Sequence, residues 1–224
     1  MAFAVLLLIV GAVCPAETAD DPLLKLFESQ YHSARTLEAT FLERYRENGE
    51  VSRVEAGDAY FLRPGKMRWD YRAPEKNTFL VDGKYVWFYS PSDHTATRMP
   101  VKQSEDWRTP MSLLTSHLTL SQLCSKVLPA QEPPAQAGDS VYRCTLRSAK
   151  DSSGTSAKPV LFELTPQGQL ARIVVPQEGA IEIEFSFAGW RWNPPLKKAI
   201  FQFLPPPDVV IVDGLLPDGP GLRQ

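Results

Sequence analysis

The sequence predicts a mainly β protein (α+β), with one strongly curved antiparallel sheet of about eleven strands and about three helices on its concave side. Three observations lead to this fold class. Most periodic segments alternate apolar and polar residues, turn signals separate these segments at short intervals, and only three segments have helical spacing. About eleven strands with only three amphipathic helices do not all stack as a two-layer sandwich of equal sheets, so a single strongly curved sheet fits better.

Residues 57–89 carry the strongest strand signals. The alternation at residues 66–72 puts three large side chains on one face of a strand: Met67, Trp69 and Tyr71. Asp82-Gly83 is a two-residue hairpin signal. Every residue from Tyr85 to Tyr89 is apolar or aromatic, so we expect both faces of that strand to be covered.

The other elements follow in chain order. A helix begins at Pro22 behind the N-cap Asp21 and ends near residues 33–35. A short helix runs from Pro110 through Met111, Leu113 and Leu114, and a second begins near Thr119. Its apolar stripe holds Leu120, Leu123, Cys124 and Val127. Residues 128–140 are predicted to be a loop. Strands are predicted at residues 37–44, 51–54, 57–62, 66–71, 78–81, 85–90, 95–100, 141–146, 159–164, 170–176, 181–187, 199–203 and 209–212.

Composition and motifs exclude several classes of function. The 224 residues are 43% hydrophobic and 22% charged, with a formal net charge of -2, which argues against nucleic acid as a partner. The three histidines are far apart and no CxxC occurs, so we expect no metal and no cofactor. Glu182 and Glu184 fall on the polar side of an alternating strand and are interpreted as solvated carboxylates. We therefore expect a non-enzyme, and a monomer.

The N-terminus has the pattern of an export signal. An uncharged apolar run precedes Cys14-Pro15-Ala16, so residues 1–16 are predicted to be a signal peptide cleaved after Ala16. Residues 17–213 are then the folded domain and 214–224 a disordered tail. A lipidated Cys14 is the alternative, although the residues before it depart from a lipoprotein signal. No basic residue precedes the apolar run, so the start codon could lie upstream.

Cys124 and Cys144 form an even pair in an exported chain. Because that compartment is oxidising, a disulfide between them is our hypothesis, and two buried free thiols are the alternative.

Several motifs resemble the outer-membrane lipoprotein carrier (LolA) family. The stretches that carry the resemblance are GDAYFLRPGKMRWDYRAP, LVDGKYVWFY, the helix TPMSLL, and FQFLPP followed by Val209. Upstream, Leu37-x-Ala39-x-Phe41-x-Glu43 stands where the family has its first strand, usually with Gln in place of Glu43. The match covers nearly the whole mature chain in the right order.

The resemblance implies an unclosed half-barrel whose helical lid covers a hydrophobic cavity for acyl chains. It implies that Arg63 acts as a lid latch by donating to backbone carbonyls of the lid. The candidates for the lipid-binding cavity or its mouth are Met67, Trp69, Tyr71, Leu113 and Leu114. From periodicity alone, a lid and sheet that form a filled core remain an alternative. The Cys124/Cys144 pair and the loop at 128–140 are departures from the family, and an oxidised pair would restrict the lid.

The resemblance also implies partners and a location. We expect a periplasmic carrier that takes acylated lipoproteins from an inner-membrane lipoprotein-releasing ABC transporter (LolCDE-like) to an outer-membrane acceptor, if one is present. An outer-membrane-anchored acceptor or lipid-binding lipoprotein of the same fold is the alternative. A lipid-sensing regulatory module is a third possibility, but such proteins usually carry a further domain.

Overall fold

A computed structural model describes residues 21–103, 112–115, 119–147, 159–177 and 179–214. The predicted signal peptide, Cys14, Met111 and residues 215–224 of the predicted tail lie outside these ranges. Three α-helices are described: α1 (Pro22–Ser33), α2 (Ser112–Thr115) and α3 (Leu120–Leu123). Short 3-10 helices cover Val101–Gln103 (η2) and Lys198–Phe201 (η4).

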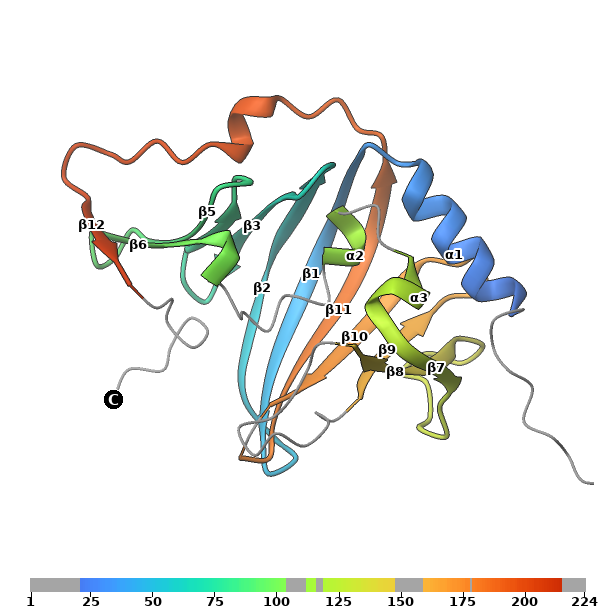
Figure 1. The fold of residues 1–224 in the computed structure, drawn as a ribbon. Helices are drawn as coiled ribbons and strands as arrows, with labels where there is room; N and C mark the ends of the chain where they lie inside the picture. Colours follow the sequence, from blue (N-terminus) through green and yellow to red (C-terminus); the bar gives the residue numbers. More distant parts are fainter. Residues whose placement is uncertain (1–20, 104–111, 116–118, 148–158, 178, 215–224) are drawn as a thin grey trace, which may run out of the picture.

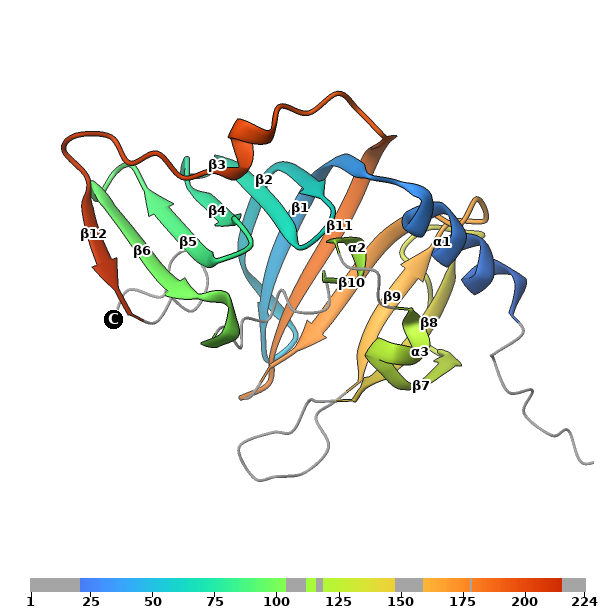
Figure 2. The same ribbon diagram turned by 45° about the horizontal axis from the view of Figure 1, so that its top comes forward.

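The described strands form a single 12-stranded sheet with the order β12-β6-β5-β4-β3-β2-β1-β11-β10-β9-β8-β7. The sheet curves around the helices and its two ends stay apart, which gives the predicted unclosed half-barrel (Figures 1 and 2). All neighbours are antiparallel except β12, which runs parallel to β6. The strands are β1 (Thr36–Glu47), β2 (Glu50–Leu62), β3 (Lys66–Ala73), β4 (Thr78–Val81), β5 (Tyr85–Ser90), β6 (Thr95–Pro100), β7 (Cys124–Pro129), β8 (Ser140–Leu146), β9 (Val160–Leu164), β10 (Leu170–Pro176), β11 (Ile181–Trp192) and β12 (Val210–Asp213).

The concave face of the sheet is an aromatic core centred on Trp69, which is 0% exposed. Its ring lies 4.7 Å from that of Phe41 on β1 and 5.1 Å from that of Phe185 on β11, between ring centroids. Gly57 on β2 lets the strands approach here, because an added Cβ would lie 2.1 Å from the Asp70 carbonyl oxygen. The predicted alternation of β3 is therefore the packing of the barrel interior.

Helix α1 lies across the ends of β8, β9 and β10 (Figure 1). Asp21 caps the helix as predicted, because its side chain accepts from the Leu23 and Leu24 N–H groups. The other Asp21 oxygen accepts from the Tyr142 hydroxyl at 2.8 Å. Tyr31 accepts from the Leu170 N–H through its hydroxyl at 3.0 Å. These contacts fix the helix to the sheet at both of its ends.

Strand β5 is covered on both faces, as predicted. Val86 and Phe88 pack into the concave core, whereas Trp87 belongs to a second apolar cluster on the convex face. The segment 193–209 runs across that convex face and places Phe201 in the cluster at 0% exposure (Figure 1). The predicted strand at 199–203 was wrong: residues Lys198–Phe201 form η4, because one turn of helix suffices to insert Phe201 into the sheet surface.

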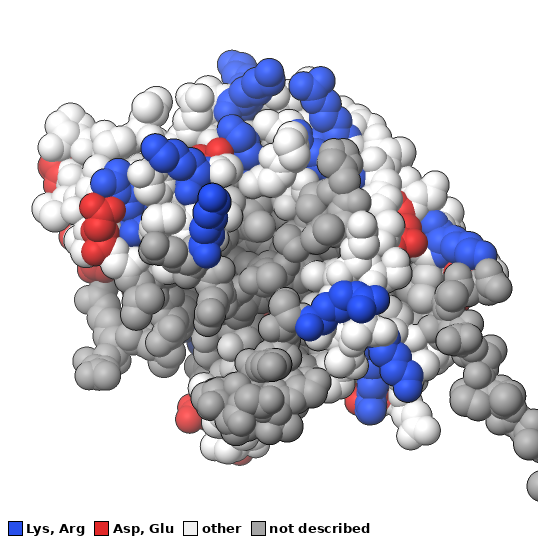
Figure 3. All heavy atoms as spheres, viewed as in Figure 1, with Lys and Arg blue, Asp and Glu red and all other residues white. Residues whose placement is uncertain are grey.

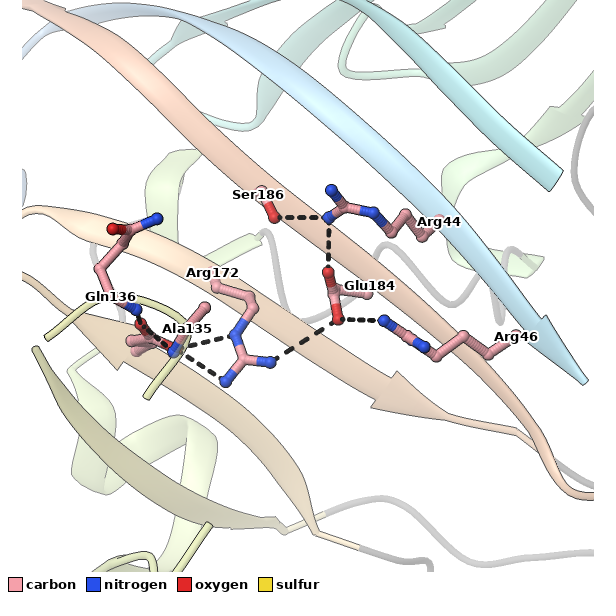
Figure 4. Close-up of polar contacts among 8 residues, drawn as sticks. Arg44, Arg46, Ala135, Gln136, Arg172, Glu184 and Ser186 are labelled. Atoms are coloured by element: carbon pink, nitrogen blue, oxygen red, sulfur yellow. Dashed lines mark hydrogen bonds and ion pairs between the residues drawn. The ribbon is translucent and has the colours of Figure 1, made fainter. Parts of the chain in front are cut away.

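Glu184 is not solvated, contrary to the prediction. It is 6% exposed and accepts from Arg44 at 2.7 Å, while Arg46 and Arg172 approach its other oxygen at 3.6 Å (Figure 4). The neighbouring Glu182 is exposed, as predicted. Three guanidinium groups pair with the Glu184 carboxylate in this buried position. The alternation of residues along one strand does not reveal these partners, because they come from neighbouring strands.

Further boundaries differ from the prediction, and the strands predicted at 51–54 and 57–62 form the single strand β2. The second lid helix is a single turn, because Cys124 already begins β7 and Val127 pairs with Cys144 across the β7–β8 ladder. Irregular backbone covers residues 130–139 rather than 128–140. This segment folds onto the convex face, where the Ala135 and Gln136 N–H groups donate to the buried Glu163 carboxylate (Figure 4).

Candidate functional site

Helices α2 and α3 lie over the concave face of the sheet (Figures 1 and 2). The turn between β2 and β3 contacts the C-terminal end of α2, where the last carbonyl groups of a helix have no hydrogen-bond partner within the helix. Arg63 Nε donates to the Leu114 carbonyl oxygen at 3.2 Å, and the Gly65 N–H donates to the Thr115 carbonyl oxygen at 2.9 Å. Successive carbonyls of α2 are thus bound by one side chain and one backbone group of the same turn.

Two properties of this turn suit it to hold α2. Gly65 has φ +67°, a left-handed conformation that directs its N–H to the helix and that side chains rarely adopt. Arg63 is only 7% exposed, and its burial lowers the pKa of the guanidinium. The cation is therefore placed away from water and against the lid backbone, where a hydrogen bond is electrostatically stronger than in solvent.

Helix α3 begins at a capping box. The Thr119 side chain accepts from the Gln122 N–H, and the Gln122 side chain accepts in return from the Thr119 N–H. The Glu28 carboxylate of α1 accepts from the Leu120 N–H. At the other end, Arg147 donates to carbonyl oxygens of α3. Both ends of this short helix are therefore bonded to the rest of the fold.

An apolar cavity of about 20 Å³ lies between these helices and the sheet. Side chains from α1, α2, α3 and β7–β10 line it: Phe27, Leu114, Leu120, Leu123, Cys124, Cys144, Leu146, Val160, Phe162, Leu170 and Ile173. A space of this size holds roughly one water molecule, far below the roughly 300–1,000 Å³ of small-molecule pockets. The lid is thus closed onto the sheet.

A disulfide joins Cys124 to Cys144 in the wall of this cavity. Their Cα atoms are 5.5 Å apart, and the bond links the start of β7 to β8. Cys124 is also the C-cap residue of α3. The crosslink therefore lies directly behind the second lid helix.

The sequence-predicted residues divide between the cavity and the core. Leu114 lines the cavity, while Met67, Trp69 and Tyr71 lie buried in the aromatic core beneath the lid and do not line it. Leu113 lies in α2, and its side chain is outside the described part of the structure. Arg63 contacts the lid as described above.

Sequence reasoning missed most of the cavity lining, which comes from α1 and from β8–β10. The stripe of Phe27 on α1 and the alternation of Phe162 on β9 mark both side chains as apolar. Nothing local indicates that the two rings pack against each other. Only the crossing of α1 over the sheet brings them together.

One polar pair lies within the concave core. The Tyr71 hydroxyl donates to the Glu43 carboxylate at 2.7 Å, and both residues are at most 2% exposed. This buried hydrogen bond fixes the orientation of the Tyr71 ring in the core.

The described residues contain no group of three or more His, Cys, Asp or Glu side chains arranged to hold a metal ion. In the same part of the chain, no helix has the length and apolar character needed to cross a membrane. On the face viewed in Figure 3, lysine and arginine side chains cover more of the described surface than acidic side chains do.

Comparison with known proteins identifies the family. The model of the outer membrane lipoprotein carrier protein LolA matches residues 32–204. This chain belongs to the LolA family. A protein named outer-membrane lipoprotein carrier protein from Nitrosomonas europaea is 28% identical over 218 residues, covering 92% of this chain and 97% of the relative. One of the same name from Methylococcus capsulatus is 36% identical over 115 residues, or 51% of this chain and 53% of the relative.

The fold is also found in solved structures. An uncharacterized conserved protein from Thermus thermophilus superposes with a TM-score of 0.53 at 14% identity, covering 86% of this chain and 97% of that one. That likeness concerns the fold alone. Membership of the LolA family and the names of the relatives support a lipoprotein-carrier role for this chain.

Proposed function

We propose that this LolA-family protein is a periplasmic carrier that binds the acyl chains of lipoproteins between its lid helices and its concave sheet. It receives acylated lipoproteins from an inner-membrane ABC transporter of the LolCDE type and passes them to an outer-membrane acceptor. The observation that carries the proposal is the apolar cavity beneath a lid whose helix α2 is held by the Arg63–Gly65 turn.

The need for such a carrier follows from the hydrophobic effect. Burying an acyl chain is favourable by about 0.8 kcal/mol per CH₂, so a multiply acylated protein does not cross water unaided. The cavity wall is apolar throughout, which suits it to alkyl chains rather than to polar ligands.

At about 20 Å³ the cavity is too small for an acyl chain, so cargo binding requires the lid to move. The latch is then part of the mechanism. Cargo and lid compete for the same space, and closing the lid over the sheet helps to expel the cargo. Arg63 influences the equilibrium between the closed and the open lid, because its hydrogen bond to the Leu114 carbonyl forms only when α2 packs on the sheet.

Met67, Trp69 and Tyr71 take a supporting role in this proposal. They form the floor on which the closed lid rests, and they meet an acyl chain once α2 has moved aside. Leu114 is the residue of α2 that lines the cavity, so it moves away from the cavity when α2 opens.

The test uses mature protein incubated with spheroplasts or inner-membrane vesicles that carry lipoproteins and an active transporter. Recovery of a soluble one-to-one complex with a lipoprotein is the expected result. Failure to recover any complex with a competent transporter would contradict the proposal. Mass spectrometry of the native N-terminus distinguishes the carrier from the alternative, an anchored acceptor. A chain that begins at Glu17 supports the carrier, and a chain that begins at a diacylglyceryl Cys14 supports the anchored acceptor.

A further inference from the structure

The two lid helices are attached to the sheet in similar ways. Each helix is contacted by an arginine that follows the last residue of a strand. The arginine side chain donates to one carbonyl oxygen of the helix, and a backbone N–H of the same turn donates to a later carbonyl oxygen. For α2 these groups are Arg63 and Gly65, as described above. For α3, Arg147 supplies both, since its Nε donates to the Ser121 carbonyl oxygen at 2.8 Å and its N–H to that of Leu123 at 3.0 Å.

The attachments differ in strength, because α3 has a covalent link next to it. Cys124 directly follows α3 and is bonded to Cys144, three residues before Arg147. Arg147 and the disulfide thus hold the same helix from the same strand, β8. The residues of α2 include no cysteine, so its attachment consists of non-covalent contacts alone.

The surroundings of α3 add to this difference. Its first turn is tied to α1 through the Glu28 carboxylate, and α1 is itself fixed to the sheet by Asp21 and Tyr31. Leu120 of α3 is buried against the concave core. The helix is therefore held by α1 at its start and by β8 at its end.

We infer that Arg147 is a positioning residue that, together with the disulfide, fixes α3 to the β7–β8 edge, so that the lid opens on the α2 side only. The inference rests on the proposed carrier function and adds the direction from which acyl chains enter. Leu120, Leu123, Cys124 and Cys144 then form a fixed wall of the cavity. Leu114 on α2 moves away from that wall when the Arg63 contact breaks.

The experiment measures amide hydrogen exchange in α2 and α3 of the oxidised mature chain. Arg63→Gln is expected to accelerate exchange in α2 about tenfold, the effect of losing one hydrogen bond from a charged donor, with α3 changed less than about twofold. Arg147→Gln, placed in a Cys124→Ala/Cys144→Ala background, is expected to accelerate exchange in α3 about tenfold over that background. The matched control is Arg143→Gln, on the same strand but paired with Glu132 away from the lid.

Equal acceleration of α2 and α3 in Arg63→Gln would overturn the one-sided lid. Unchanged exchange of α3 in the disulfide-free Arg147→Gln chain would remove Arg147 from the inference. If the disulfide-free chain does not fold, as judged by urea unfolding, the Arg63→Gln comparison in oxidised protein still decides whether the lid opens on one side.

A second readout is the uptake rate of a fluorescent diacylated lipopeptide. With the disulfide intact, uptake should rise in Arg63→Gln and change less than about twofold in Arg147→Gln, because α2 alone gates entry. Equal acceleration by both substitutions would contradict the inference. If no variant and not even the unaltered protein takes up the lipopeptide, the proposed function fails, while hydrogen exchange still decides which helix moves.

Discussion

Replacing Arg63 by leucine should make this carrier hold its cargo more tightly and release it more slowly. A hydrogen bond from a charged group to a carbonyl contributes about 1.5–3 kcal/mol, and the substitution removes the one to Leu114. Because Arg63 is a buried cation, an apolar replacement also relieves its desolvation cost, which favours the lower end of that range. About 1.5 kcal/mol corresponds to roughly a tenfold shift from the closed towards the open lid.

The shift in lid population determines the expected binding constants. If the closed form dominates the free protein, the apparent affinity for an acylated ligand should rise about tenfold, because less closing energy opposes binding. Dissociation of the ligand should slow by a similar factor, because the hydrogen bond between Arg63 and the Leu114 carbonyl no longer re-forms to favour release of the acyl chain. The assay is stopped-flow dissociation and equilibrium titration of a fluorescent diacylated lipopeptide with mature protein.

The control for this prediction is Arg191→Leu. That arginine forms an exposed ion pair with Glu38 across the β1–β11 ladder and does not contact the described lid helices. It should leave both constants within about twofold of the unaltered protein, as surface substitutions usually do. Identical dissociation rates for Arg63→Leu and the unaltered protein, with equal urea midpoints, would refute the latch reasoning.

Three further changes test the packing. Cys124→Ala/Cys144→Ala should destabilise the fold by about 3 kcal/mol in urea unfolding, from loop-closure entropy; a loss near zero would mean that the crosslink adds no constraint. Glu184→Ala leaves Arg44 and Arg46 without this acceptor, while Arg172 keeps Glu163. It should cost about 1–3 kcal/mol, while its neighbour Glu182→Ala stays within about 0.5 kcal/mol; equal effects would contradict the buried pairing. Trp69→Ala should cost about 3–5 kcal/mol in thermal unfolding, and normal stability with impaired lipid binding would instead assign Trp69 to the cavity.

Much of the fold could be predicted from local patterns. The N-cap at Asp21, the hairpin at Asp82-Gly83 and the alternation of β3 each depend on a few neighbouring residues, and their elements lie where these signals indicate. The two-sided burial of β5 was equally visible, because a run without polar residues needs cover on both faces.

What the sequence did not indicate depends on partners distant along the chain. Ala199, Phe201 and Phe203 alternate like a strand, yet the sheet edge available to them is taken by β12, and the segment crosses the convex face instead. Glu184 looks solvated until β1 and β10 bring arginines beside it. The cavity wall combines α1, the lid and β7–β10, and no single segment specifies that combination.

The convex face of the half-barrel has a consequence for truncated forms of the protein. A chain that ended after β11 would keep the concave side of the sheet but would lack the segment that shields Trp87 and Leu80 from water. The shortened chain would expose an apolar surface on the convex face, next to the unpaired edge strand of the sheet, and this combination promotes aggregation. A chain shortened at this point should therefore aggregate more readily than the full-length protein.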